Sequence, residues 1–178
     1  MRASVLMLTP IMLAAAVASA QQSHNTNAPI DFGADRIELQ DRANRAVLSG
    51  EVSVKQAEMT LNAARMTVAY TGQVIGGNPQ VSRLDASGGV VVRRPDQTAR
   101  GQYAIYDLNR RVITMLGGVT LAQGGSTVNG GRLTINLDTG RAVIDGSSVS
   151  GGAAPAAGGG VQQRGGRVTG TFSVPDRN

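Results

Sequence analysis

The sequence predicts an all-β fold in which short strands stack as a solenoid. Three observations support this prediction: apolar and polar residues alternate with a period of two, a short unit recurs along the chain, and the composition suits tight turns. The chain contains 24 glycines, and only 3% of its residues are aromatic. This composition is typical of short strands that are joined by close turns.

The repeat is visible as two series of short segments with related spacing. The first series consists of Gly50–Val52, Gly88–Val90 and Gly117–Val119, at intervals of 38 and 29 residues. The second series, at intervals of 29, 38 and 29, consists of Arg36–Leu39, Arg65–Val68, Tyr103–Tyr106 and Arg132–Ile135. A period of this size that recurs about four times indicates a solenoid built from one supersecondary unit.

Each unit is predicted to contain two strands. In the first unit, Ile37 and Leu39 alternate with charged residues, 41–44 supply a turn, and alternation resumes over 47–55. Residues 59–63 favour a helix by propensity, but their alternation and register predict a strand. The third unit alternates over 104–108 and 119–121, and the fourth over 133–137 and at Val143.

The first 20 residues are predicted to be a signal peptide. Arg2 precedes an apolar run, and Ala18-Ser19-Ala20 gives the small residues of a cleavage site. The run is shorter than the roughly 20 apolar residues of a spanning helix, which makes a membrane anchor the weaker alternative. An exported chain of this kind is expected in the periplasm.

The rest of the chain is predicted to divide into four parts. Residues 21–28 form an N-terminal extension, and residues 29–146 form the β domain. The Gly- and Ala-rich composition of 147–166 predicts a linker. Residues 167–178 are either one last strand that docks on the domain or a tail, and alternation from Val168 favours the strand.

The sequence offers little for catalysis, so no enzyme activity, cofactor or metal site is predicted. His24 is the single histidine and lies in the polar extension, and the chain contains no cysteine. The carboxylates mostly occupy turns or outward strand positions, where solvated residues are expected. The formal net charge is +5, but no dense basic cluster with interleaved aromatics is present. We therefore predict no nucleic-acid partner.

The inward phase of the strands forms an aliphatic stripe that includes methionines. Such a lining suits acyl chains better than sugars, which usually stack on aromatic faces. From the residues alone, a closed core is the better interpretation of this stripe, and an open apolar groove is the alternative.

Four stretches together resemble the OstA-like family. They are Ile30–Leu39, Ala46–Gln56, Leu61–Val68 and Ala99–Leu108. The resemblance covers about Pro29 to Asp145, and Arg167–Pro175 is similar to the basic-then-apolar ending of such a protein. The long Gly- and Ala-rich linker departs from the family pattern.

The resemblance implies a V-shaped, jellyroll-like stack of antiparallel strands with an apolar groove for the lipid A chains of lipopolysaccharide. It also implies a carrier that bridges the inner and outer membranes of a Gram-negative cell. Expected partners are other copies joined head to tail and the inner- and outer-membrane components of lipopolysaccharide transport (Lpt) that contain OstA-like domains. The expected groove residues are Ile30, Phe32, Ile37, Leu39, Val52, Val54, Leu61, Met66, Val68, Tyr106, Leu108, Val119, Leu121, Leu133 and Ile135.

Three other interpretations rank lower. The first is a structural periplasmic β-solenoid that self-assembles without a lipid cargo. The second is the soluble domain of an outer-membrane assembly partner, and the last is an enzyme.

Overall fold

The computed structural model describes residues 24–72, 77–146 and 168–171. The predicted signal peptide and the predicted linker lie outside these residues, as does most of the C-terminal segment. Within the described residues, ten strands and one short 3-10 helix, η1, follow in the order below. They are β1 (Ile30–Gly33), β2 (Arg36–Gln40), η1 (Asp41–Ala43), β3 (Arg45–Gln56), β4 (Met59–Thr71), β5 (Gln80–Arg94), β6 (Gln97–Asp107), β7 (Val112–Gln123), β8 (Ser126–Asn136), β9 (Ala142–Asp145) and β10 (Thr169–Thr171).

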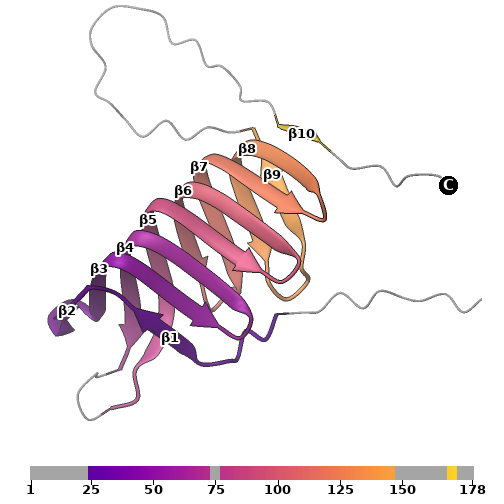
Figure 1. Ribbon diagram of the computed structural model, residues 1–178. Coiled ribbons are helices and arrows are strands. Elements are labelled where there is room, and N and C mark those ends of the chain that lie inside the picture. The colour runs from indigo at the N-terminus through magenta and orange to yellow at the C-terminus, as the bar shows by residue number, and fades with distance from the viewer. Residues whose placement is uncertain (1–23, 73–76, 147–167, 172–178) are drawn as a thin grey trace, which may run out of the picture.

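These strands form one antiparallel sheet in which β3 to β8 pair in sequence order. Each of these long strands bends near its middle, where the pairing register shifts between Ser49 and Val52 and at matching points in the other strands. The bend folds the sheet into two layers, and Figure 1 shows the strands stacked as rungs with a half in each layer. The predicted all-β fold is confirmed.

We name the two layers leaf A and leaf B. Leaf A contains β1, residues 52–56, 59–63, 90–94, 97–101, 119–123 and 126–130, and β10. Leaf B contains β2, residues 45–49, 65–71, 80–87, 103–107, 112–116 and 132–136, and β9. The hairpin turns of both leaves lie away from the bend, and we call this side the mouth.

The repeated glycine pairs lie at the bend. Gly88 and Gly117 have φ angles of +85°, a backbone conformation that residues with a side chain rarely adopt. A Cβ atom at Gly88 would lie 2.7 Å from Cβ of Ala64, and one at Gly117 would lie 2.8 Å from Cβ of Gln102. Both the backbone angle and the close approach of the preceding strand therefore require glycine at these two positions.

The core lies between the leaves, because the alternation places one face of every strand inward. Leu48, Ile113 and Leu133 are among the side chains that have no exposed surface. The extra residue of each β-bulge bends the strand and also shifts its pairing register. The apolar side chains therefore point inward on both sides of each bend. Within each leaf the buried residues alternate with a period of two. In β3 this phase continues through the bend, from Leu48 to Val52, whereas in β4 it shifts by one residue, from Ala63 to Met66.

Two short strands terminate the sheet at each end. At the first edge, β1 pairs with the leaf A half of β3 and β2 pairs with its leaf B half. At the other edge, β9 and β10 pair with the two halves of β8. Thr169–Thr171 therefore forms a strand on the sheet, which was one of the two alternatives that the sequence left open.

Candidate functional site

The inner faces of the two leaves bury most of the residues that were predicted to line a groove. In this conformation these side chains are almost inaccessible to water because the opposite leaf covers them. They are Val52, Val54, Leu61, Met66, Val68, Tyr106, Val119, Leu121, Leu133 and Ile135. Ile30 and Leu108 are partly buried and pack against this cluster.

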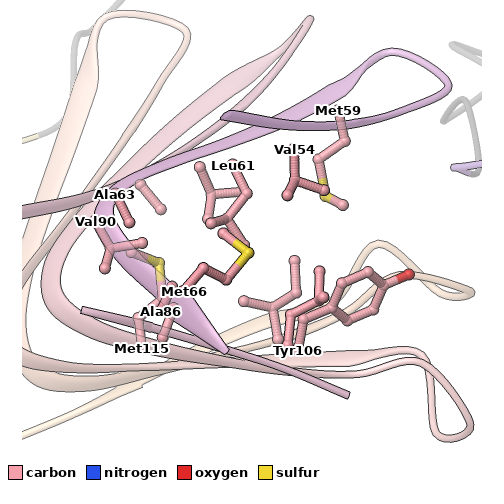
Figure 2. Close-up of a cluster of buried hydrophobic side chains, with 14 of the residues drawn as sticks. Val54, Met59, Leu61, Ala63, Met66, Ala86, Val90, Tyr106 and Met115 are labelled. Carbon is pink, nitrogen blue, oxygen red and sulfur yellow. The ribbon is translucent and has the colours of Figure 1, made fainter. Parts of the chain in front are cut away.

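Figure 2 shows side chains of the two leaves pointing toward each other. Val54, Met59 and Leu61 project from leaf A, and Met66 and Tyr106 project from leaf B. Apart from Tyr106, these residues are aliphatic or methionine, and methionine side chains repack easily around a new neighbour. The interior is thus an adaptable apolar layer between two sheets.

Several interior residues were absent from the predicted groove set although the same signal marks them. Leu84, Ile113 and Met115 are fully buried on the inner face. They alternate in phase with Ala86 and Val119 on their own strands. Alternation over 84–92 and 113–121 could have identified them from the sequence.

The interior remains open to solvent at the first edge of the sheet. Phe32, Ile37 and Leu39 are exposed by 52%, 45% and 54%. Phe32 is the cross-strand partner of Val54, and Ile37 is the partner of Leu48. Because directly opposed residues of an antiparallel pair share one face, these three side chains extend the apolar inner face beyond the buried core.

A polar contact joins the leaves at the mouth. The Tyr106 hydroxyl, on leaf B, donates a hydrogen bond of 2.7 Å to Oε1 of Gln56, on leaf A. Gln56 is 2% exposed and Tyr106 is 1% exposed. Gln56 follows Val52 and Val54 in the inward phase of β3, so a polar residue in an apolar phase is the sequence signal that could have identified it.

The segment His24–Pro29, which we call the strap, lies across this contact. Nε2 of Gln56 donates hydrogen bonds to the backbone oxygens of Thr26, at 2.9 Å, and Ala28, at 3.1 Å. His24 Nε2 lies 3.3 Å from Gln56 Oε1. Both donors and both acceptor positions of the Gln56 amide are therefore occupied, which removes most of the cost of burying it.

The strap also contacts leaf B. Arg111, in the turn between β6 and β7, donates a hydrogen bond of 3.3 Å from Nη2 to Oδ1 of Asn27. Nη1 of the same guanidinium lies 3.3 Å from Oδ1 of Asp138, in the turn after β8. The strap thus extends from β1 at the first edge to a turn in the middle of the stack.

Burial shifts the pKa of two groups in this network. It raises the pKa of Tyr106 to about 12, while the Arg111 charge opposes and the Asp138 charge supports the rise. Tyr106 is therefore a neutral hydrogen-bond donor across the physiological range. Burial also lowers the pKa of His24 from 6.5; the charge of Arg94 acts in the same direction, and the Gln56 hydrogen bond and Glu58 oppose it. The strap histidine is therefore neutral at pH 7.

A depression of about 380 Å³ lies elsewhere, on leaf B. Its lining includes Arg65, Asp85, Tyr103 and Leu116, and none of the predicted groove residues. Most of its lining residues, such as Thr67, Asp85 and Ile105, alternate with the buried inner-face residues, so the depression lies on the outer face of leaf B.

Residues 24–72, 77–146 and 168–171 contain neither a candidate metal site nor a helix that could span a membrane. No group of three or more His, Cys, Asp or Glu side chains there could hold a metal ion. None of the helical structure in these ranges has the length and apolar character needed to cross a membrane.

Comparison with known proteins places this fold in a family. Residues 32–141 match the family model described as LptA/(LptD N-terminal domain) LPS transport protein. An uncharacterized protein of Rhizobium meliloti (strain 1021) is 32% identical over 145 residues, which are 76% of this chain and 78% of that protein.

A solved structure has the same fold. It is the crystal structure of LptH, described as the LptA homologous periplasmic component of the conserved lipopolysaccharide transport device from Pseudomonas aeruginosa. The TM-score is 0.66 at 18% sequence identity, over 84% of this chain and 99% of that one. The family match covers more than half of the chain and confirms the predicted family: this protein belongs to the LptA/(LptD N-terminal domain) lipopolysaccharide transport family.

Proposed function

We propose that this protein is a periplasmic carrier of lipopolysaccharide that helps to bridge the inner and outer membranes. The acyl chains of lipid A lie between leaf A and leaf B, and the sugars remain in water outside the mouth. The protein supplies a path and performs no chemical reaction. Membership of a lipopolysaccharide transport family supports this role.

The observation that carries the proposal is the exposed inner face at the first edge. Phe32, Ile37 and Leu39 present apolar surface to solvent in line with the buried interior. A single folded domain gains nothing from leaving such residues in water, since burial of each would contribute roughly 1.5–3 kcal/mol. A neighbouring domain or a lipid chain that covers them would account for their presence.

The energetics of lipid transfer favour such a path. Each CH₂ group of an acyl chain costs about 0.8 kcal/mol when it is moved from an apolar environment into water. An interior that continues from one subunit to the next removes most of this cost at every step. The adaptable methionines of the interior, among them Met59 and Met66, allow the leaves to repack around a chain.

Association with like domains follows from the edges of the sheet. β1 and β2 each pair only with β3, and β9 and β10 each pair only with β8, within the part of the chain that the structure describes. Sheets with open edges can add a strand from another domain. We propose head-to-tail contacts between copies, and the same type of contact with the membrane-bound Lpt components that contain OstA-like domains.

Site-specific photocrosslinking tests the lipid path. A photoreactive residue at Phe32, on the inner face, is expected to capture lipopolysaccharide. The matched control is Asp31, which is the partner of Lys55 on the outer face and is expected to give no product. Equal capture from both positions, or capture from neither, would contradict the proposed path.

A structural solenoid without lipid cargo is the second candidate. The observation in its favour is the tight burial of the interior, where Leu48, Met66 and Ile113 have no exposed surface. Substitution of Leu108 by Asp distinguishes the lipid carrier from the structural solenoid. In a lipid path the variant folds but transfers no lipopolysaccharide, because an unpaired carboxylate obstructs the chains. In a permanently closed core the same variant unfolds.

A further inference from the structure

The apolar interior does not explain the polar cluster at its mouth. Gln56 occupies an inward position of β3 that an aliphatic residue would fill at lower desolvation cost. Gln56 instead requires Tyr106 from leaf B and the backbone of the strap to satisfy its amide group. A buried amide whose partners come from an N-terminal segment suggests that other molecules can replace this segment.

The strap presents a particular set of oxygen atoms to this cluster. Two backbone carbonyls, of Thr26 and Ala28, accept from the Gln56 amide. One side-chain oxygen, of Asn27, accepts from the Arg111 guanidinium. An acylated lipid with an anionic head offers the same set: the ester or amide carbonyls of its chains, and a phosphate or carboxylate oxygen beyond them.

We infer that Gln56, Tyr106 and Arg111 form a polar subsite that receives the acyl carbonyls and the nearest anionic group of such a lipid. The strap is an internal substitute that occupies this subsite until the lipid displaces it. The inference rests on the proposed function, since it assumes that the acyl chains lie between the leaves.

The order of groups across the mouth agrees with this assignment. The apolar interior comes first, with Val54 and Leu61 on leaf A. The Gln56 amide and the Tyr106 hydroxyl follow at the ends of their strands, and both are buried. Arg111 lies farthest out, in a turn, with its side chain 41% exposed. A lipid has the same order of tail, carbonyl and anionic group.

At Arg111, an anionic lipid forms a stronger interaction than the strap does. A guanidinium interacts more strongly with an anionic oxygen than with a neutral amide oxygen such as that of Asn27, because the two opposite charges also attract each other. Asp138 pairs with Nη1 of Arg111 and keeps the guanidinium at the mouth, while Nη2 faces the strap. This difference favours the displaced state of the strap when an anionic lipid is bound.

Hydrogen exchange measures the displacement. The probes are lipopolysaccharide and N-lauroylsarcosinate, which has an acyl chain, an amide carbonyl and a carboxylate; dodecyl maltoside, which lacks the carbonyl and the charge, is the control. Below their micellar concentrations, the first two are expected to accelerate amide exchange at residues 25–28 without accelerating it in β4 to β7. Unchanged strap exchange at a saturating concentration of lauroylsarcosinate would contradict the inference.

Variants test the contributions of the strap and of the subsite to lipid affinity one at a time. Deletion of residues 24–28 is expected to increase the affinity for lauroylsarcosinate, measured by calorimetry. In that background, Gln56→Leu is expected to lower the affinity about three- to tenfold, the effect of one or two neutral hydrogen bonds. The matched control is Gln97→Leu: Gln97 is the other buried glutamine of leaf A and makes no hydrogen bond to the strap within the described residues.

The outcomes distinguish this inference from the proposed function. Capture of lipopolysaccharide at Phe32 together with equal affinities of the Gln56→Leu and Gln97→Leu variants would overturn the subsite and leave the carrier role standing. Lauroylsarcosinate binding that depends on Gln56, without capture of lipopolysaccharide in any variant, would support the subsite and overturn the cargo.

Discussion

The Tyr106 hydroxyl donates a hydrogen bond of 2.7 Å to the side-chain oxygen of Gln56, and this bond connects the two leaves at the mouth. The two residues are 50 positions apart in the sequence and belong to different layers of the folded sheet. The bond therefore closes the mouth across the apolar interior. It also gives the strap a fixed partner, because the same glutamine holds Thr26 and Ala28.

Removal of this bond tests its contribution to stability. Tyr106→Phe is expected to lower the free energy of unfolding by about 1 kcal/mol, the usual value for a buried hydrogen bond. Tyr103→Phe is the control, because Tyr103 is 57% exposed and a surface change should stay within about 0.5 kcal/mol. Urea denaturation of both variants gives the comparison, and equal effects would show that the Tyr106–Gln56 bond does not stabilise the fold.

The strap is expected to loosen as the pH falls. The pKa of His24 is lowered from 6.5 when the strap is docked, mainly by burial, and Arg94 and Glu58 are the charged groups that affect it. The released state therefore binds a proton more readily than the docked state. The docked state is fully favoured above about pH 6.5 and loses stability as the pH falls from there through the lowered pKa.

Nuclear magnetic resonance can follow this titration. The His24 ring is expected to titrate with a midpoint below 6.5, and amide exchange of residues 25–28 is expected to rise relative to that of β5 over the same range. In His24→Asn this pH-dependent rise of strap exchange relative to that of β5 should disappear. A midpoint above 6.5 would contradict the burial of the ring.

The bend of the sheet provides a matched pair of substitutions. Ala at Gly88 must adopt a positive φ and also meets Cβ of Ala64 at 2.7 Å, whereas Ala at Gly89 must adopt a positive φ in open space. The backbone term should cost each variant about 1–2 kcal/mol. Gly88→Ala should lose roughly 1–3 kcal/mol more through overpacking. Thermal or urea unfolding measures the difference, which would vanish if the strands separated freely at the bend.

Self-association should depend on the first edge. Leu39→Asp places a charge on the exposed inner face of β2 and is expected to weaken head-to-tail contacts while the monomer remains folded. Sedimentation velocity over a range of concentrations should show that the average mass grows with concentration for the natural sequence and less for the variant. Glu38→Gln, on the opposite face of the same strand, is the control and should associate as before.

The sequence alone determined the all-β fold, the repeat and the inward phase of the strands. These properties depend on local periodicity: a period of two puts Val52 and Val54 on one face of their strand, and Leu133 and Ile135 on one face of theirs, whatever the pairing of the strands. The repeated glycines also marked special backbone positions. The sequence did not specify which strands pair. It also did not specify that every long strand bends into two leaves, since β4 bends at Ala63–Arg65 without a glycine.

Only the tertiary structure decided what happens at the mouth and at the edges. The strap, Gln56 and the segment that contains Tyr106 and Arg111 lie far apart in the sequence, and no local pattern specifies that their hydrogen bonds meet. Phe32 and Leu39 have the same alternation as the buried residues, yet they remain exposed because no further strand among the described residues continues the sheet beyond β1 and β2. Periodicity gives the direction of a side chain, whereas its burial depends on which neighbour the folded sheet places opposite it.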